Sequence, residues 1–190
     1  MPGMSTDPAT PGETEAAPAD ASRDLVSRLV EASELRGDFV LSSGRRSSVY
    51  FDKFLFLTSP GLLRELAHEV AGLVPVGVDH LAAPEGAATL LVAAVSLETG
   101  LPVAVVRKEP KAYGTRSQIE GHAPRGARAC LIEDVSTTGH QVQRAAVALT
   151  DAGVTVERIV LAIDRGGADH LRGSGYDVAA VAVLRPQDGG

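Results

Sequence analysis

Short apolar runs alternate with helix-like segments from residue 80 to residue 184. The runs are rich in Val, Ile, Leu and Ala and have the length of buried strands, and the segments between them are predicted to be helices. Strands are predicted at 80–82, 102–106, 129–133, 158–163 and 178–184, and helices at 87–98, 140–152 and 168–173. This alternation predicts an α/β domain with a mostly parallel central sheet flanked by helices.

The N-terminal part of the chain has a different pattern. Residues 23–36 carry an apolar stripe at helical spacing, which predicts a helix. The stripe consists of Leu25, Val26, Leu29, Val30 and Leu35. Two short β-like runs follow, 39–41 and 49–51, and the turn-like segment between them predicts a hairpin.

A second helix is expected to begin at Ser59-Pro60, because Ser is a favoured helix cap and Pro a favoured first helical residue. We expect residues 23–58 to form a small helix-and-hairpin element within a single domain, 23–190. Residues 1–22 are rich in Pro, Ala, Ser, Thr and acidic residues and contain little apolar bulk. Such a segment cannot bury enough surface to offset chain entropy, so a disordered tail is predicted there.

Composition and charge narrow the class of protein. The formal net charge is −6, with 18 basic and 24 acidic side chains, so nucleic-acid binding is not expected. The single cysteine, Cys130, excludes an internal disulfide and a cysteine-based zinc site. It lies in an apolar run and is interpreted as a small buried hydrophobe. No signal peptide and no run of about 20 apolar residues is seen, so we expect a cytoplasmic protein without a membrane segment.

The strongest candidate site is the segment 129–140, in which an apolar strand runs into Glu133-Asp134, a hydroxyl-rich turn and an amphipathic helix. Backbone N–H groups at a helix start can cradle a phosphate. The hydroxyls of Ser136, Thr137 and Thr138 add donors, and Gly139 allows the backbone to approach a ligand closely. The two carboxylates would accept hydrogen bonds from the sugar hydroxyls, or help hold a cation, about one ribose away from the phosphate. The outline is that of a ribose 5-phosphate site.

Other readings of this segment are weaker. The two carboxylates could simply end a strand, with Ser136 or Thr137 capping a helix. The Walker A pattern and the G-x-G-x-x-G dinucleotide fingerprint are both absent, which disfavours ordinary nucleoside triphosphate and NAD sites.

The second candidate site is the segment that contains Lys108 and Lys111. The chain holds three lysines against fifteen arginines, and two of the three, Lys108 and Lys111, are three residues apart. A compact ammonium on a flexible stem can follow a departing diphosphate. The alternative is a solvated basic edge before a turn. The segment 112–124 that follows has few apolar residues and is predicted to be a mobile loop that acts as a lid.

These motifs resemble those of a known family. Residues 131–139 resemble the motif that binds 5-phosphoribosyl-1-diphosphate (PRPP) in type I phosphoribosyltransferases. The run Arg107-Lys-Glu-Pro-Lys-Ala-Tyr-Gly114 is similar to the catalytic loop of orotate phosphoribosyltransferases. Segments 39–47, 50–52, 119–121 and 162–166 are also similar to that family, so the resemblance covers about residues 25–184. It implies a type I phosphoribosyltransferase fold in which residues 23–58 form a hood over the base.

The resemblance also implies roles for individual residues. Lys111, Asp134 and Lys108 are the expected catalytic residues. The expected PRPP-binding residues are Arg107, Lys108, Lys111, Tyr113, Glu133, Asp134, Val135, Ser136, Thr137, Thr138, Gly139, His140 and Gln141. The expected orotate-binding residues are Thr137, Arg165, Tyr50, Phe51 and Ser42, with Arg165 facing the orotate carboxylate. Mg²⁺ is the expected cofactor, carried mainly by PRPP rather than by protein ligands.

Three positions depart from the family pattern. Tyr113 replaces the usual His, and Ser42 stands where some members have Lys. The segment Ala83-Pro84-Glu85-Gly86 replaces a Gly-containing diphosphate loop and is one residue shorter. Glu85 beside an anionic leaving group is unexpected unless it contacts Mg²⁺ or points away.

The implied activity is transfer of the phosphoribosyl group of PRPP to orotate, which gives orotidine 5′-monophosphate and diphosphate. A homodimer is implied, with the lid reaching the neighbouring subunit's site. Two alternatives stay open: a phosphoribosyltransferase for another base, and a catalytically weakened regulator that binds PRPP or a nucleotide. Retention of Lys108 and Lys111 argues against the regulator, because a binding protein has little use for a leaving-group lid.

Overall fold

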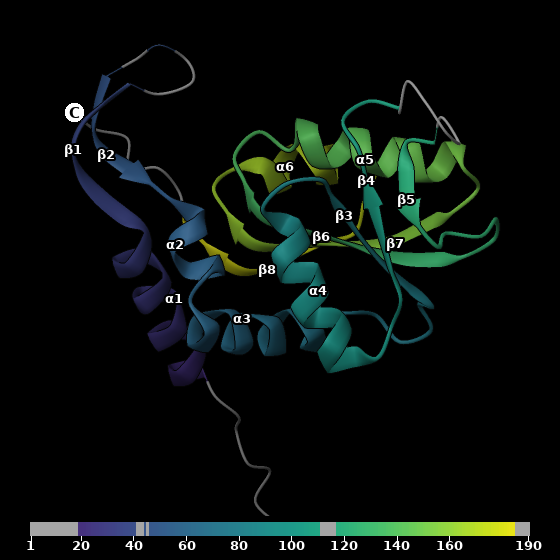
Figure 1. Ribbon diagram of the computed structural model, residues 1–190, viewed down its shortest axis with the longest axis horizontal. Helices are drawn as coiled ribbons and strands as arrows, with labels where there is room; N and C mark the ends of the chain where they lie inside the picture. Colours follow the sequence, from purple (N-terminus) through teal and green to yellow (C-terminus); the bar gives the residue numbers. More distant parts are fainter. Residues whose placement is uncertain (1–18, 41–43, 45, 111–116, 185–190) are drawn as a thin grey trace, which may run out of the picture.

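The computed structural model describes residues 19–40, 44, 46–110 and 117–184, and Figure 1 shows how they are arranged. Its centre is a six-stranded sheet with the order β5-β4-β3-β6-β7-β8. The strands are β3 (His80–Pro84), β4 (Val103–Val106), β5 (Ile119–Gly121), β6 (Arg128–Ser136), β7 (Thr155–Asp164) and β8 (Val178–Val183). Neighbouring strands are parallel except for the β4–β5 pair. The predicted α/β class with a mostly parallel sheet is confirmed.

Helices cover both faces of this sheet (Figure 1). One face packs against α1 (Ala19–Ser33), α2 (Lys53–Leu57), α3 (Pro60–Gly72) and α4 (Ala88–Thr99). The other packs against α5 (His140–Asp151) and α6 (Gly167–Gly173). The period-two alternation of strand side chains divides the core: Cys130 and Ile132 of β6 face the first layer, and Leu131 faces the second. Burial raises the pKa of the Cys130 thiol to about 12, as expected for an inert buried cysteine.

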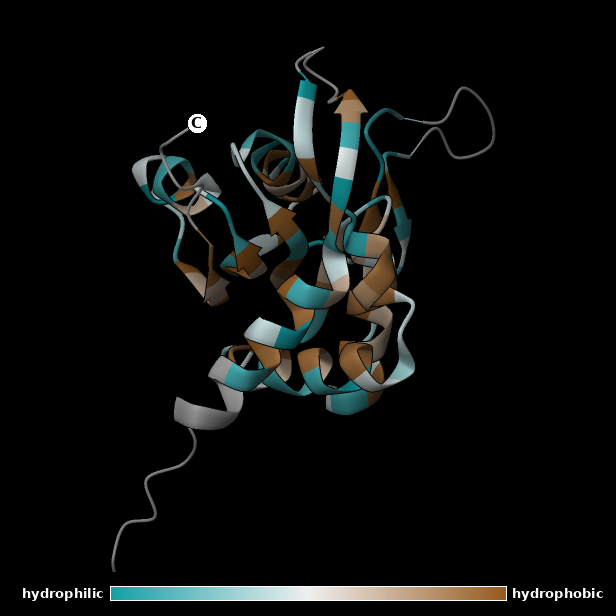
Figure 2. Cartoon of the chain, turned by 90° about the vertical axis from the view of Figure 1, so that its left-hand side faces the viewer, coloured by the Kyte–Doolittle hydropathy of each residue, from teal (hydrophilic) through white to brown (hydrophobic). Residues whose placement is uncertain are grey.

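The hairpin forms a separate two-stranded sheet, β1 (Glu34–Val40) and β2 (Arg46–Phe51), in which the strands pair antiparallel. It stands to one side of the main sheet, and its ribbon mixes polar and apolar residues, whereas the strands of the main sheet are mostly apolar (Figure 2). The predicted hairpin is therefore present. Its position leaves large apolar side chains, including Val40 and Val49, exposed.

Several predicted boundaries were wrong. The first helix begins at Ala19 and ends at Ser33, so Leu35 is not on its apolar stripe but pairs with Tyr50 across the hairpin. The backbone is held at this junction, where the Asp52 amide donates to the Ser33 carbonyl at 2.9 Å. The pairing between distant segments, which helical periodicity does not report, decides where the helix stops.

Three further differences concern elements near the predicted sites. β6 runs to Ser136, so Asp134 and Val135 belong to the strand rather than to the loop. The lid segment contains a short antiparallel strand, β5, at the sheet edge. The helix α2 was not predicted; Asp52 caps it by accepting the Phe54 amide at 3.0 Å. Ser59 stands at the cap of α3 as expected, but its side chain makes no capping bond.

None of the helices in the part of the chain described here has the length and apolar character needed to cross a membrane.

Removing a core side chain of β6 should cost stability, because Leu131 is fully buried between the sheet and α5. We expect Leu131→Ala to lower the free energy of unfolding by about 2–5 kcal/mol. Leu97→Ala is the matched control, since Leu97 is 89% exposed, and it should change that free energy by less than about 0.5 kcal/mol. Urea unfolding followed by circular dichroism measures both, and equal losses would contradict the assigned core.

Candidate functional site

The candidate site lies where β6 and β7 end and the helices α5 and α6 begin. Ligands of open α/β sheets bind at these carboxyl ends of parallel strands. Asp164, buried at the end of β7, accepts hydrogen bonds from the amides of Gly166 (2.9 Å) and Ala168 (3.0 Å) and so fixes the start of α6. The Arg165 amide donates to the Ser136 carbonyl at 2.7 Å, which joins the two strand ends.

Two glycines allow the turn after β6 to pack directly against α6. Gly139 has φ +77°, and a Cβ there would lie 2.7 Å from the Gly167 carbonyl oxygen. A Cβ on Gly167 would lie 2.0 Å from the Ser136 hydroxyl. Any larger side chain at either position must displace the turn, so Gly139 is needed here for packing against α6, and its expected close approach to a ligand stays a prediction.

A cavity of about 120 Å³ opens beside this turn, and we call it the loop cavity. It is lined by Lys53, Glu133, Val135, Ser136, Thr137, Thr138, Gly139, Gln141 and Val142. Most residues expected to bind the phosphoribosyl group therefore lie around one space. Two do not line it: Asp134 is fully buried behind the wall, and His140 is exposed and packs edge-on against the ring of His170 at 4.4 Å.

The two carboxylates are buried side by side at the end of β6. Burial, together with the neighbouring charge of Asp134, raises the pKa of Glu133 to about 8. The charge of Lys53 opposes this rise. Asp134 Oδ1 accepts hydrogen bonds from the Val135 amide at 2.5 Å and from Lys53 Nζ at 2.9 Å.

Lys53 was not assigned to the site from the sequence. It is the first residue of α2, and its side chain both contacts Asp134 and lines the loop cavity. Two features of the sequence could have pointed to it. Lysine is rare in this chain, with three in all, and Lys53 directly follows Tyr50-Phe51-Asp52, a segment that resembles the family. Only the fold shows that α2 brings Lys53 next to Asp134 of β6, which is 81 residues away in the sequence.

A second, smaller cavity of about 20 Å³ adjoins the loop cavity through Gln141, which lines both. Its lining includes Arg107 and Lys108 at the end of β4, and Arg144 of α5. Sequence reasoning did not single out Arg144. Two of the cations expected to contact diphosphate, Arg107 and Lys108, therefore line a cavity that shares Gln141 with the loop cavity. Lys111 and Tyr113, expected in the same group, lie outside the described residues.

Glu85 turns toward these cations rather than into open space. Its Oε1 accepts the Lys108 amide at 2.9 Å, and its Oε2 lies 4.0 Å from the Arg107 guanidinium. The next residue, Gly86, has φ +117°, so the shortened loop keeps a glycine at a left-handed position. The unexpected carboxylate is thus a structural link between the β3–α4 loop and the end of β4.

On the other side of the strand ends, Arg165 lies over the ring of Phe51, 5.2 Å from its centroid. Phe51 ends β2, so this contact connects the hairpin to β7. Tyr50 stacks instead on Phe39 within the hairpin, with ring centroids 5.5 Å apart. Ser42 lies outside the described residues. Two of the expected base-binding residues, Arg165 and Phe51, are therefore in contact with each other.

Buried polar atoms without a hydrogen-bond partner gather at the site. In the described ranges they include Ser136 Oγ, Asp134 Oδ2 and Arg107 Nε. Such atoms are uncommon in folded proteins, because leaving one unsatisfied costs about 1–3 kcal/mol. Ser136 and Arg107 line the two cavities, so a polar ligand bound there would complete these two groups, whereas His80 Nε2, also without a partner in the described part of the chain, lies at the start of β3.

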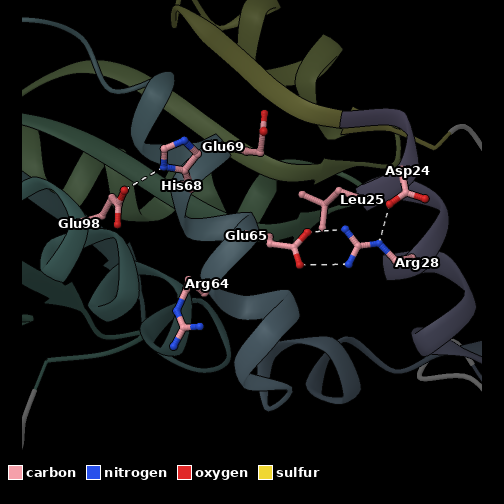
Figure 3. Close-up of a pocket in the computed structure, with 8 residues that line it drawn as sticks. All are labelled: Asp24, Leu25, Arg28, Arg64, Glu65, His68, Glu69 and Glu98. Atoms are coloured by element: carbon pink, nitrogen blue, oxygen red, sulfur yellow. Dashed lines mark hydrogen bonds and ion pairs between the residues drawn. The ribbon is translucent and has the colours of Figure 1, made fainter. Parts of the chain in front are cut away.

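A larger groove of about 390 Å³ lies elsewhere, among the helices α1, α3 and α4 (Figure 3). Its charged side chains are largely paired with one another: Arg28 contacts Asp24 and Glu65, and His68 contacts Glu98 at 2.8 Å. It contains none of the residues expected from the sequence to bind PRPP or orotate.

The raised pKa of Glu133 has a consequence for stability. The pKa of this carboxyl is near 4.5 in the unfolded chain and about 8 in the folded one, so the folded state holds the proton more tightly. Protonated Glu133 therefore contributes to the free energy of unfolding in full below pH 4.5, and this contribution is lost as the pH rises through 8. Glu133→Gln should flatten this fall, which is at most about 1.4 kcal/mol per pH unit. Urea unfolding at several pH values measures it, and parallel pH profiles for wild type and variant would contradict the assignment.

Comparison with known proteins places the chain in a family. No protein-family model matches it. It is 42% identical to the orotate phosphoribosyltransferase of Thermococcus gammatolerans, over 83% of this chain and 86% of that protein. It is 46% identical to the Nocardioides enzyme of the same name, over 81% and 87%. The crystal structure of orotate phosphoribosyltransferase from Aeropyrum pernix matches with a TM-score of 0.70 and 34% identity, over 86% of this chain and 93% of that one. The chain belongs to the orotate phosphoribosyltransferase family.

Proposed function

We propose that this protein transfers the phosphoribosyl group of PRPP to orotate, releasing diphosphate and forming orotidine 5′-monophosphate. The observation that carries the proposal is the shared edge of the sheet: a hydroxyl-rich anion loop, a buried carboxylate pair and Arg165 lie at the ends of adjacent strands β6 and β7. Family membership supports orotate over another base.

The loop cavity is proposed to hold the 5-phosphate and ribose. The amides and hydroxyls of Ser136, Thr137 and Thr138, with Gly139, His140 and Gln141, would donate to the phosphate, and the start of α5 adds favourable partial charge. Ser136 supports this role, because its hydroxyl is buried at the cavity without a partner among the described residues. Glu133 lines the same space and would accept the ribose hydroxyls, with Asp134 behind it and Val135 in the wall.

The leaving diphosphate is proposed to bind next to the second cavity. Arg107 and Lys108 are in place there, and Lys111 and Tyr113 would approach from the adjoining lid segment. Lys111 is the proposed main stabiliser of the leaving group. The reaction inverts C1 through a transition state with oxocarbenium character, so these residues act by neutralising charge and by positioning the reactants rather than by covalent chemistry.

Mg²⁺ is proposed to arrive on PRPP and to neutralise part of the diphosphate charge. The donor set fits this arrangement, because Glu133 is the one carboxylate among the described residues that line the loop cavity, while Asp134 is engaged by Lys53. Across the described ranges, His, Cys, Asp and Glu form no group of three that could hold a metal. Mg²⁺ readily keeps several waters and needs few protein ligands.

Orotate is proposed to bind between the hairpin and the end of β7. Arg165 would pair with its carboxylate in the bidentate geometry that guanidinium favours. Stacking on Phe51 limits the directions in which that guanidinium can point. Thr137, the backbone near Tyr50 and Phe51, and Ser42 would complete the base site. We further propose a homodimer in which the lid reaches the neighbouring site; the cytoplasmic location stays an expectation.

The function is tested by incubating the protein with PRPP and Mg²⁺ and following diphosphate release with orotate, uracil, adenine, guanine or hypoxanthine. Orotate should be turned over far faster than uracil, which lacks the carboxylate. Preferred turnover of a purine would identify a phosphoribosyltransferase for another base. Binding of PRPP without release in any mixture would identify a regulator.

Arg165→Ala should raise the KM for orotate by at least about tenfold, because a charge-assisted hydrogen-bonded pair contributes about 1.5–3 kcal/mol. The KM for PRPP should change far less, since Arg165 does not line the loop cavity. Arg64→Ala removes a cation from the surface of α3 and is the matched control. An unchanged KM for orotate in Arg165→Ala would show that this residue does not bind the base.

A further inference from the structure

The Lys53–Asp134 ion pair joins a half-exposed cation to a carboxylate with no exposed surface. Lys53 Nζ lies 2.9 Å from Asp134 Oδ1, and the Lys53 side chain is 37% exposed. An ammonium has three N–H donors, and Asp134 accounts for one of them. Because Lys53 also lines the loop cavity, its remaining donors are available on the side where the phosphoribosyl group is proposed to bind.

The backbone of Lys53 is held in place by its neighbours. The preceding residue, Asp52, caps α2 through the Phe54 amide and is itself tied to Ser33 through its own amide. Phe56 and Leu57 of the same helix are buried in the core between α1, α3 and the sheet. The backbone position of Lys53 beside the end of β6 is therefore fixed by the packed fold, and the ion pair with Asp134 directs its side chain.

The charge of the loop cavity requires such a cation. The segment 131–142, which supplies most of the lining, contains Glu133 and Asp134 and neither Lys nor Arg. Without Lys53, a phosphate brought into this space would meet the Glu133 carboxyl, with the Asp134 carboxylate buried behind it, and only amide and hydroxyl dipoles to offset its charge. Lys53 is the one Lys or Arg side chain among the described residues that line the cavity. It neutralises one carboxylate and counteracts the rise in the pKa of the other.

We propose that Lys53 is a further PRPP-binding residue, anchored by Asp134, which presents its ammonium to the oxygens of the phosphoribosyl group in the loop cavity. Asp134 is then a positioning residue that acts through Lys53. This inference rests on the proposed function, because it takes PRPP as the ligand. It also gives the N-terminal element a direct role in holding PRPP, beside its expected role as a hood over the base.

The test measures the affinity of PRPP with Mg²⁺ by isothermal titration calorimetry in the absence of orotate. Lys53→Met, which keeps the side-chain length and removes the charge, should weaken PRPP binding by about tenfold or more. Lys53→Arg should recover most of the affinity, because it restores a cation that can pair with Asp134. The control Arg64→Met removes an exposed cation from α3 and should leave PRPP affinity unchanged. Unaltered affinity in a folded Lys53→Met protein would overturn the inference.

A second variant keeps the test decisive if Lys53→Met unfolds the protein, since an unpaired buried carboxylate can cost about 3–5 kcal/mol. The double variant Lys53→Met/Asp134→Asn removes both charges and should fold. Its PRPP affinity should be weakened by about tenfold or more, as expected for Lys53→Met alone, because Asp134 acts only through Lys53. Wild-type affinity in the double variant, or fully additive losses in the two single variants, would overturn the assigned roles.

Failure of this inference can be distinguished from failure of the proposed function. If wild type binds PRPP but releases no diphosphate with orotate, the transferase proposal fails, and the Lys53 variants still report on PRPP binding. If wild type turns over orotate and Lys53→Met binds PRPP normally, only the inference about Lys53 fails. Absence of PRPP binding by wild type would contradict both.

Discussion

The burial of two adjacent carboxylates at the end of β6 is the constraint on which the candidate site depends. Charged groups in a protein interior are costly unless they are paired and hydrogen-bonded. Here the pairing comes from Lys53, which belongs to the N-terminal element rather than to the sheet. The Lys53–Asp134 pair therefore links α2, which is held by the core, to the end of β6. One ion pair thus both neutralises a buried carboxylate at the end of β6 and connects the N-terminal element to the sheet.

Close backbone contact supplies the second part of the site. The turn at Gly139 packs against Gly167 with no room for a side chain, and Asp164 holds the start of α6 through two amides. This packing holds the loop in shape, while Ser136 Oγ keeps no partner among the described residues. A site prepared in this way offers its donors to a ligand without first breaking internal hydrogen bonds, which lowers the cost of binding.

Much of the fold could be predicted from the sequence, because β6 and β7 are continuous apolar runs of strand length and α5 has apolar residues at helical spacing. The turn at 136–139 could also be singled out from the sequence, since its residues are adjacent in the chain, and its binding of phosphate stays a prediction. What the sequence could not show depends on contacts between distant segments. Helix α1 ends at Ser33 because β1 pairs with β2, and Lys53 enters the site because α2 packs on the core. Glu85 was read as an anomaly until its contacts with the Lys108 amide and the Arg107 guanidinium gave it a structural role. The predictions for Lys111, Tyr113 and Ser42 lie outside the described residues.

The central claim is that the loop cavity between β6, α5 and Lys53 is where the phosphoribosyl group binds. The most direct measurement is a crystal structure of the protein soaked with PRPP and Mg²⁺. The 5-phosphate is predicted to accept hydrogen bonds from the turn at 136–139, with Lys53 Nζ in contact with both Asp134 and the ligand. A phosphoribosyl group seated elsewhere, such as in the helical groove around Arg28 and Glu65, would contradict the claim.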